Sequence, residues 1–392
     1  MKKKMFRFIG KIFKRKRKCV DFPKDTSWML KSDFSPNIKN LKRCKEFQAL
    51  MDVKQNPQYH KEGDVWKHTL KVAKEMHKII NGITWGISDK DKKILMVAAI
   101  CHDIGKATTT YFDTKENAWK CKNHGLEGER MTRNLLYNET IEEREEICWL
   151  VRWHMTFHHL LEKPIDKQTE IIRTLSKGYS TLEKLLFLNL ADSRGSVSEE
   201  NTEEKINERF QQICKITIDE DCYIKPFKEK NDTPKHPIMY VMIGLPGSGK
   251  DTYIKRFLNP DYPCICRDDI REELVDGVVM GRKFQLKPRE ENIVTEVVNK
   301  NIRECCQKNK NFIINQTSLK RKYRDELISY AKKYADVKVV YIYIEAPSVE
   351  ECIKRRGGGK WKSIVNQMWN NIDFPDKSEC DEMLMIKQKG ED

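Results

Sequence analysis

The stretch PIMYVMIGLPGSGKDT, residues 237–252, joins an apolar run to a glycine-rich turn and then to a polar segment. The apolar run is typical of a buried strand, and the segment that follows the turn is typical of a helix. Gly244, Gly249 and Lys250 meet the spacing G-x-x-x-x-G-K. Such glycines let backbone N–H groups face phosphate oxygens, and the helix adds its positive end. The stretch therefore predicts a nucleoside-triphosphate site in an α/β domain.

The side chains of this turn assign the parts of the expected site. Lys250 should neutralise the β and γ oxygens of ATP, but the next position, which usually supplies a hydroxyl to Mg²⁺, is Asp251. Thr252, one place later, is the hydroxyl we expect, because a carboxylate aimed at phosphate would be repelled. A glycine turn that binds no nucleotide is the alternative. The expected ATP-binding residues here are Gly244, Gly247, Ser248, Gly249, Lys250 and Thr252.

Apolar runs rich in β-branched and aromatic residues recur around this stretch and alternate with helical segments. This alternation predicts a parallel sheet with helices on its faces. The expected strands are 238–244, 262–267, 311–317 and 337–344, with 382–387 as a fifth candidate.

The residues before this domain repeat apolar positions at helical spacing from about 41 to 218 and predict an all-α domain. A charged, proline-containing segment then predicts a linker. The expected organisation is a basic arm and lead-in (1–40), a helical domain (41–218), a linker (219–236) and the α/β domain (237–392).

The net charge of +15 over 392 residues is concentrated in the arm. Residues 2–18 carry ten Lys or Arg and no acid, which leaves about +5 (15 − 10) for the rest. The arm could contact nucleic acid or an anionic membrane surface, or be a solvated terminus.

No run approaches the ~20 apolar residues of a membrane span. Thirteen cysteines without a C-x-x-C pair, and no export signal, predict free thiols and a cytoplasmic protein.

Histidines and aspartates recur along the helical region in an order that suits metal binding. Imidazole and carboxylate ligands on several helices can surround one or two divalent ions, and Asp103 has two oxygens with which to bridge two ions. Water between such ions is acidic enough to attack phosphorus. The expected ligands are His68, His102, Asp103, His124, His154 and Asp192.

Other residues of this region have open roles. Lys106, one turn beyond Asp103, could hold a substrate phosphate. His158 or His159 could replace His154, since they share a short segment. Any one histidine alone would more often be structural.

A second polar cluster, RDDIR at 267–271, follows the expected strand 262–267. A kinase that acts on a hydroxyl needs a carboxylate near the γ-phosphate and a cation for the acceptor. Asp268 and Arg271 have these properties, although Asp268 or Asp269 could simply cap a helix.

The motifs GLPGSGK and RDDIR resemble the kinase domain of phage-type 5′-hydroxyl polynucleotide kinases. The resemblance implies that Asp268 is the general base and that Arg271 binds the acceptor phosphate. It extends to "RRGGGKW" (355–361), where the family has a basic lid: Arg355 matches a lid arginine, with Arg356 and Lys360 as further candidates. Gln316 stands where the family commonly has an acid, which weakens the parallel in metal binding.

The helical region is similar to the HD phosphohydrolase superfamily over most of residues 45–215, and its stretch NPQYHKEGDVWKHTL (56–70) is similar to HD domains fused to tRNA nucleotidyltransferases. Together the two regions resemble HD-domain polynucleotide kinases. That resemblance implies ATP- and Mg²⁺-dependent phosphorylation of 5′-OH ends of RNA or DNA. It also implies removal of 2′,3′-cyclic, 3′- or 2′-phosphates with one or two ions such as Mn²⁺, Ni²⁺ or Co²⁺. Sealing would then require a separate ligase.

Two other functions remain open. The modest charge outside the arm favours a small-molecule or nucleoside kinase fused to a nucleotide phosphohydrolase, because a long polyanion usually needs a broader basic surface. A non-catalytic, NTP-sensing module that tethers nucleic acid would explain Asp251 and Gln316 as marks of a weakened kinase.

Overall fold

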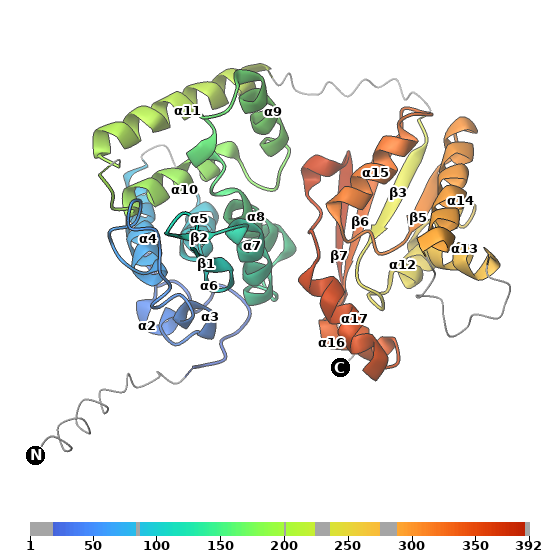
Figure 1. Ribbon diagram of the computed structural model, residues 1–392, viewed down its shortest axis with the longest axis horizontal. Coiled ribbons are helices and arrows are strands. Elements are labelled where there is room, and N and C mark those ends of the chain that lie inside the picture. The colour runs from blue at the N-terminus through green and yellow to red at the C-terminus, as the bar shows by residue number, and fades with distance from the viewer. Residues whose placement is uncertain (1–18, 84–86, 200, 224–235, 275–287, 389–392) are drawn as a thin grey trace, which may run out of the picture. The chain divides into compact units, whose positions relative to one another are not determined.

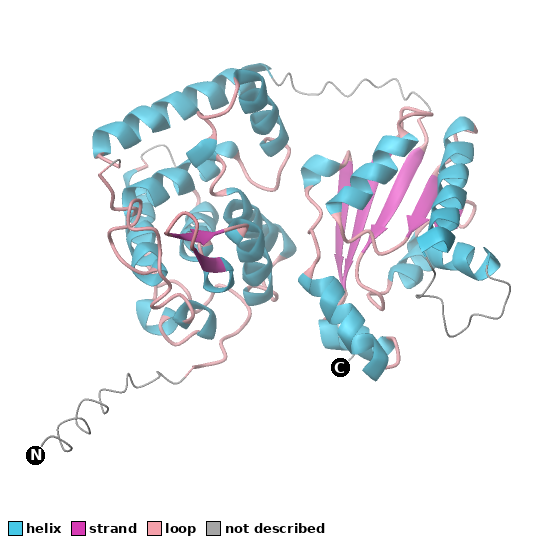
Figure 2. Cartoon of the chain, in the orientation of Figure 1, coloured by secondary structure: helices cyan, strands magenta, loops and turns pink. Residues whose placement is uncertain are grey.

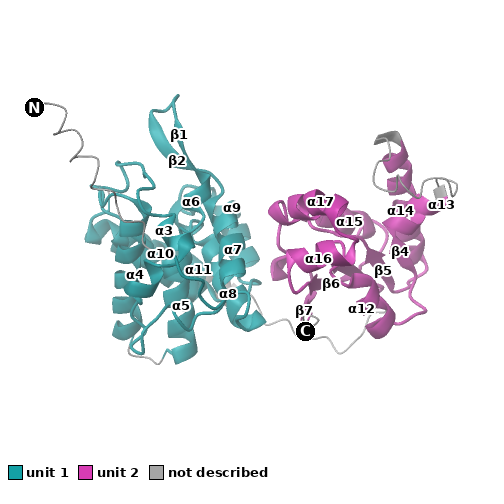
Figure 3. Ribbon diagram, turned by 90° about the horizontal axis from the view of Figure 1, so that it is seen from below, with its two compact units in different colours: residues 1–225 teal, residues 226–392 magenta. Residues whose placement is uncertain are grey.

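The computed structural model describes residues 19–83, 87–199, 201–223, 236–274 and 288–388. The chain divides into two compact units, residues 1–225 and 226–392 (Figures 1 and 3). The expected basic arm at 2–18 and residues 224–235 of the expected linker lie outside the described residues. Among the described residues, no helix has the length and apolarity needed to cross a bilayer. Every cysteine that the structure describes is a free thiol, as expected.

Unit 1 is built mainly of helices, as predicted. Two of its longer helices are held by side-chain caps at their starts: Asp64 accepts a hydrogen bond from the Lys67 amide, and Thr181 accepts one from the Lys184 amide. The helices are α2 (Ile38–Leu41), α3 (Lys45–Gln48), α4 (Val65–Gly82), α5 (Asp89–Cys101), α6 (Lys106–Thr109), α7 (His124–Leu135), α8 (Ile141–Trp153), α9 (Ile165–Leu175), α10 (Leu182–Gly195) and α11 (Glu203–Tyr223), with a 3₁₀ turn at Phe157–His159.

Helix α5 explains why the expected metal ligands His102 and Asp103 lie inside the domain. Its sequence ILMVAAIC, residues 94–101, is buried at every position, so this helix is enclosed by its neighbours. The helix ends at Cys101, and His102 and Asp103 follow at once. The apolar helix therefore delivers two polar ligand candidates into the core.

Unit 1 also contains features that the sequence analysis did not predict. A two-stranded antiparallel hairpin, β1 (Thr110–Asp113) and β2 (Ala118–Cys121), interrupts the helices. In the lead-in, Trp28 and Met29 are buried in the helical core, so residues 19–40 belong to this unit. Helix α11 continues to Tyr223, past the expected boundary at residue 218.

Unit 2 has a five-stranded parallel sheet of order β4-β5-β3-β6-β7, which confirms the predicted fold (Figure 2). Strand β6 is buried along nearly its whole length, as expected for a strand covered on both faces. The strands are β3 (Ile238–Ile243), β4 (Cys264–Cys266), β5 (Phe312–Asn315), β6 (Lys338–Glu345) and β7 (Glu382–Lys387).

The strand order determines where a ligand can bind. The chain leaves β3 for one side of the sheet, through β4 and β5, and then continues on the other side with β6 and β7. Ligands of such folds bind beyond the carboxyl ends of the strands where the order reverses, here after β3. The helices are α12 (Lys250–Phe257), α13 (Arg267–Leu274), α14 (Pro288–Gln307), α15 (Arg321–Ala331), α16 (Val349–Arg355) and α17 (Gly359–Asn370), with a 3₁₀ turn at Lys377–Glu379.

Candidate metal centre and candidate nucleotide site

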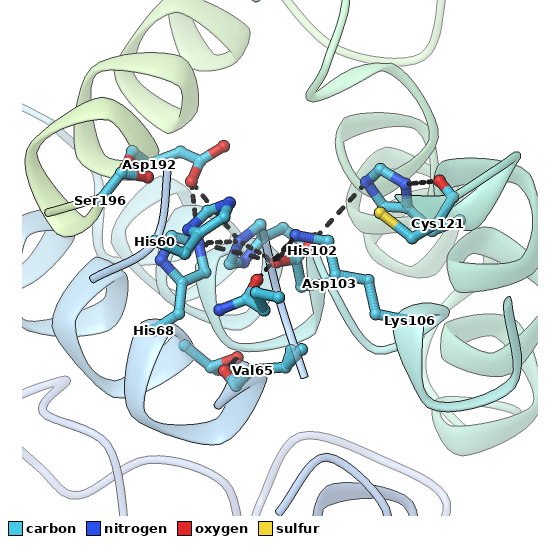
Figure 4. Close-up of polar contacts among 12 residues, drawn as sticks. His60, Val65, His68, His102, Asp103, Lys106, Cys121, Asp192 and Ser196 are labelled. Atoms are coloured by element: carbon cyan, nitrogen blue, oxygen red, sulfur yellow. Dashed lines mark hydrogen bonds and ion pairs between the residues drawn. The ribbon is translucent and has the colours of Figure 1, made fainter. Parts of the chain in front are cut away.

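The six expected ligands of unit 1 come from five segments far apart in sequence and lie together in its core (Figure 4). None of the six is more than 7% exposed. They are His68 on α4, His102 and Asp103 after α5, His124 at the start of α7, His154 after α8, and Asp192 on α10.

Asp103 lies between two pairs of histidines. Its Oδ2 lies 3.6 Å from His68 Nε2 and 3.4 Å from His102 Nε2. Its Oδ1 lies 3.5 Å from His124 Nε2 and 3.6 Å from His154 Nε2. Both oxygens are buried, and among the described residues neither accepts a hydrogen bond of regular geometry, although Oδ2 forms an ion pair with Lys106 Nζ at 2.7 Å. Since a buried carboxylate normally has hydrogen-bond partners, this one is suited to bind cations.

The histidines are oriented as metal ligands would be. His102 Nδ1 lies 2.9 Å from the Ala99 carbonyl, and His154 Nδ1 lies 2.7 Å from the Val151 carbonyl. A carbonyl can only accept, so Nδ1 carries the proton and the Nε2 lone pair faces inward.

The spacing of the inward nitrogens also fits a metal centre. His68 and His102 have Nε2 atoms 3.2 Å apart, and His124 and His154 have theirs 3.2 Å apart. Two nitrogens that each lie ~2.1 Å from one ion at tetrahedral or octahedral angles are about 3.0–3.4 Å apart. The residues present therefore fit one or two divalent cations.

The alternative histidines at 154, 158 and 159 differ in their contacts with Asp192 and Asp103. Its Oδ1 lies 3.0 Å from His68 Nε2, and its Oδ2 accepts a hydrogen bond of 2.9 Å from His158. His158 thus contacts the cluster through Asp192, whereas His154 faces Asp103 directly. His159 is exposed and lies beside Glu162.

Two further residues that the sequence analysis missed, Glu62 and Gln55, support the cluster. Glu62 Oε1 lies 2.9 Å from His68 Nδ1 and 2.8 Å from His60 Nδ1, so it orients the His68 ring. Lys106, one of the expected site residues, is buried with its Nζ 2.7 Å from Asp103 Oδ2, and it donates a 3.1 Å hydrogen bond to Gln55. Gln55 stands in no motif, and Glu62 lies in the stretch 56–70 without a predicted role, so both contacts are seen only in the tertiary fold.

The protonation of the cluster suits metal binding. Burial lowers the pKa of His124 to about 4 and also lowers the pKa of His154, so both rings are neutral near pH 7. Burial opposes ionisation of Asp103, but Lys106 and the histidines hold its pKa well below its usual value. At His124 and His154, neutral imidazoles beside the ionised Asp103 are the forms that bind a cation. At His68, Asp192 and Glu62 outweigh burial and raise the pKa to about 9, so binding a cation there releases a proton.

The phosphate loop of unit 2, residues 244–249, lies between β3 and α12. Gly247 and Gly249 have φ of +83° and +94°, which favours glycine, and a Cβ at Gly247 would lie 2.7 Å from the Cys352 carbonyl. Lys250 is buried, and its Nζ donates to the carbonyls of Gly244 and Leu245, each at 2.9 Å. The backbone carbonyls of the loop therefore hold the Lys250 ammonium group against the loop itself.

The residues next to this lysine differ in their contacts. Asp251 is exposed and accepts a 2.8 Å hydrogen bond from Asn315 at the end of β5. Thr252, the expected hydroxyl, is exposed on the first turn of α12. The Ser248 hydroxyl is buried and has no hydrogen-bond partner among the residues that the structure describes. Asp251 is thus held by the neighbouring strand.

Asp268 and Arg271 lie on α13, directly after β4, and contact each other. Arg271 Nη1 donates to Asp268 Oδ1 at 2.6 Å, and Arg271 Nε donates to Glu291 Oε1 at 2.9 Å. Glu291, on α14, was not foreseen. The arginine that is expected to bind the acceptor phosphate is therefore paired with two carboxylates in this state.

The two expected lid arginines have different surroundings. Arg355 donates to Gln388 Oε1 at 2.8 Å, and its Nη1 lies 3.5 Å from the Gly247 carbonyl, so it reaches the phosphate loop. The Arg356 guanidinium lies 4.9 Å from the centre of the Trp361 ring. Lys360 is exposed on α17.

ATP binding should weaken as the pH rises above about 8. Burial lowers the pKa of Lys250 to about 8, so the free site loses its cation above that pH. The dissociation constant should be flat below this value and rise by up to about tenfold per pH unit above it. The measurement is ATP affinity from about pH 7 to pH 9.5. Lys250→Arg stays charged throughout and should show no such rise; an equal rise in both proteins would contradict the assignment.

Comparisons with known families agree with both units. Residues 65–188 match the family model described as HD domain, and residues 239–362 match one described as AAA domain. The chain thus fuses an HD domain to a P-loop domain of the kinase type. An HD domain implies a divalent metal, and a P-loop kinase implies ATP with Mg²⁺.

The individual relatives cover parts of the chain. The multifunctional CCA protein of Pasteurella multocida (strain Pm70) is 28% identical over 183 residues, which is 44% of this chain and 40% of that protein. The chain thus spans about two fifths of the length of this relative. A structure of the Pnkp1/Rnl/Hen1 complex has 26% identity and a TM-score of 0.28, covering 32% of this chain and 41% of that one. A second, of the Pnkp1/Rnl/Hen1 RNA repair complex, has 23% identity and a TM-score of 0.29, covering 38% and 50%.

Proposed function

We propose that this chain heals broken nucleic-acid ends. Its P-loop domain would phosphorylate 5′-OH ends, and its HD domain would remove 2′,3′-cyclic, 3′- or 2′-phosphates. The observation that carries the proposal is Asp103, whose two buried oxygens each face a pair of inward-pointing imidazole nitrogens. Such a centre acts on phosphate esters, and the same chain has a phosphate loop for a phosphoryl donor.

In the HD domain, the residues around Asp103 would hold one or two ions such as Mn²⁺, Ni²⁺ or Co²⁺. When bound, these ions supply an acidified water and positive charge for the phosphate. Lys106 lies next to Asp103 and would add positive charge on that side of the substrate phosphate. Glu62 fixes the ring of His68, so that its Nε2 stays directed at the centre.

In the P-loop domain, Lys250 and Arg355 would neutralise the phosphates of ATP, whose γ-phosphoryl group passes to the 5′ oxygen. Asp268 would accept the proton of the attacking hydroxyl, and ADP would leave. Arg271 contacts both Asp268 and Glu291. An acceptor phosphate would have to draw Arg271 away from Glu291.

Nucleic acid is the substrate class that explains both activities in one chain, because strand breaks can leave a 5′-OH at one end and a phosphate at the other. Sealing would be left to a separate ligase. The basic segment at 2–18 would add nonspecific contacts to phosphate.

A single substrate tests the proposal. An RNA oligonucleotide with a 5′-OH and a 2′,3′-cyclic phosphate is incubated with the protein, ATP, Mg²⁺ and one of Mn²⁺, Ni²⁺ or Co²⁺, and both ends are read by mass spectrometry. We expect a phosphate at the 5′ end and its loss at the 3′ end. If neither end changes while free nucleosides or nucleotides are phosphorylated or dephosphorylated, the substrate is a metabolite. A protein that binds ATP and RNA but changes neither is a tethering module.

A further inference from the structure

The β1–β2 hairpin is a part of unit 1 to which the proposed chemistry assigns no role. It joins two ligand candidates, since it follows Asp103 and ends just before His124. Figure 3 shows it standing out from the helices of this unit. An isolated two-stranded hairpin is only marginally stable in water. The contacts that attach it to the metal centre therefore help to hold it in place.

The hairpin has two distinct faces. Residues directly opposite in an antiparallel pair lie on the same face, and the faces alternate along each strand. Thr110 pairs with Cys121 and Phe112 pairs with Trp119, so these four residues share one face. Tyr111 and Lys120 form the other face.

The face that carries Phe112 and Trp119 begins at the metal centre. The Thr110 hydroxyl donates to the Lys106 carbonyl at 2.7 Å, and the His124 ring lies 3.0 Å from the Cys121 carbonyl. Figure 4 shows Cys121 near the centre. The aromatic pair lies two residues further along the strands, about 7 Å away, which is within reach of a nucleoside whose phosphate occupies the centre.

The chemistry of this face suits a nucleobase. Phe112 is 43% exposed, and its ring packs edge to face on the partly buried Trp119, with centroids 5.2 Å apart. Aromatic side chains beside a basic surface are the usual means of binding unpaired bases. Across the hairpin and its flanks, residues 107–123, three lysines stand against two acids (3 − 2 = +1), and Lys120 is paired with Asp113 and Glu116. The alternative is that Phe112 and Trp119 only stabilise the hairpin. That role would explain their ring contact, but it would not explain why their face leads to the metal centre.

We propose that Phe112 and Trp119 form a stacking platform for the base of the 3′-terminal nucleotide, and so make the HD domain select nucleic-acid ends over other phosphate esters. This inference rests on the proposed function. It assigns a single-stranded end to the HD domain, because aromatic side chains stack on unpaired bases, whereas the bases within a duplex are already paired and stacked on their neighbours.

Single substitutions on the two faces test the platform. Trp119→Ala and Phe112→Ala should each lower kcat/KM for a 3′-phosphorylated oligonucleotide by about tenfold or more, chiefly through a higher KM. Neither should change the hydrolysis of p-nitrophenyl phosphate, which has no base. Tyr111→Ala, on the opposite face and equally exposed, is the matched control and should leave both reactions unchanged. Trp119→Phe should restore most of the loss.

A second substrate separates stacking from a structural role. An oligonucleotide whose 3′-terminal nucleotide lacks its base should be a poor substrate for the wild type, and Trp119→Ala should not weaken it further. Equal losses on the oligonucleotide and on p-nitrophenyl phosphate would overturn the platform in favour of a structural role, as would an unchanged oligonucleotide reaction. Wild type that hydrolyses p-nitrophenyl phosphate but no 3′-phosphorylated oligonucleotide would instead overturn the proposed function.

Discussion

Asp103→Asn should lower removal of 3′-end phosphates by at least about 10³-fold, a barrier increase of about 4 kcal/mol, while 5′ phosphorylation continues at the wild-type rate. Asp103 is the residue that faces all four histidines of the cluster. The amide keeps the volume of the side chain but removes its charge, and it binds divalent ions more weakly than a carboxylate. The measurement is the rate at each end of the same oligonucleotide, together with bound metal per protein.

The charge change has a structural cost that needs its own control. Lys106 is buried beside Asp103, so the amide leaves a buried cation with a weaker partner. Thermal unfolding and near-UV circular dichroism would show whether unit 1 still folds. His159→Asn, an exposed position near His154, should leave both activities and the metal content unchanged. Loss of the kinase activity together with the phosphatase in folded Asp103→Asn protein would refute two independent sites.

The fold was predictable where a local pattern and the tertiary structure favour the same conformation. Each of the five strands is an apolar run in the sequence, and even the edge strand β7, only a candidate in the sequence, occurs where EMLMIK predicts it. Helix boundaries near the linker were less accurate, because a charged segment continues α11 as readily as it forms a loop. The β1–β2 hairpin was missed since its strands have four residues each and lie within a region of strong helical periodicity.

The candidate sites show the same division. The histidines and aspartates of the metal centre were predictable, because so many potential ligands at helix ends are hard to explain by packing alone. Residues that only position another site residue were not predictable. Glu62 beside His68 and Glu291 beside Arg271 have no distinguishing pattern in the sequence, and their contacts form only when the chain folds. Their partners come from other elements, and sequence spacing carries no information on such contacts.

Lys250→Ala should abolish 5′ phosphorylation, with a fall of at least about 10²–10³-fold, and should leave removal of 3′-end phosphates unchanged. In the structure Lys250 Nζ is held by the carbonyls of Gly244 and Leu245, so the phosphate loop presents a positioned cation before ATP arrives. Loss of this cation removes charge stabilisation at the transferred phosphoryl group, where water is excluded and electrostatic effects are large. The assay is transfer of the γ-phosphoryl group of ATP to a 5′-OH oligonucleotide.

Two further variants make the Lys250 result specific. Lys255→Ala removes an exposed lysine from the same helix and should retain wild-type kinase activity. Asp268→Ala should lose kinase activity without losing affinity for ATP, because Asp268 is expected to act on the acceptor hydroxyl and not on the donor. Activity within about tenfold of wild type in Lys250→Ala, a change of about 1.4 kcal/mol, would show that another cation carries the reaction. Arg355, which contacts both Gln388 and the loop, would then be the residue to replace next.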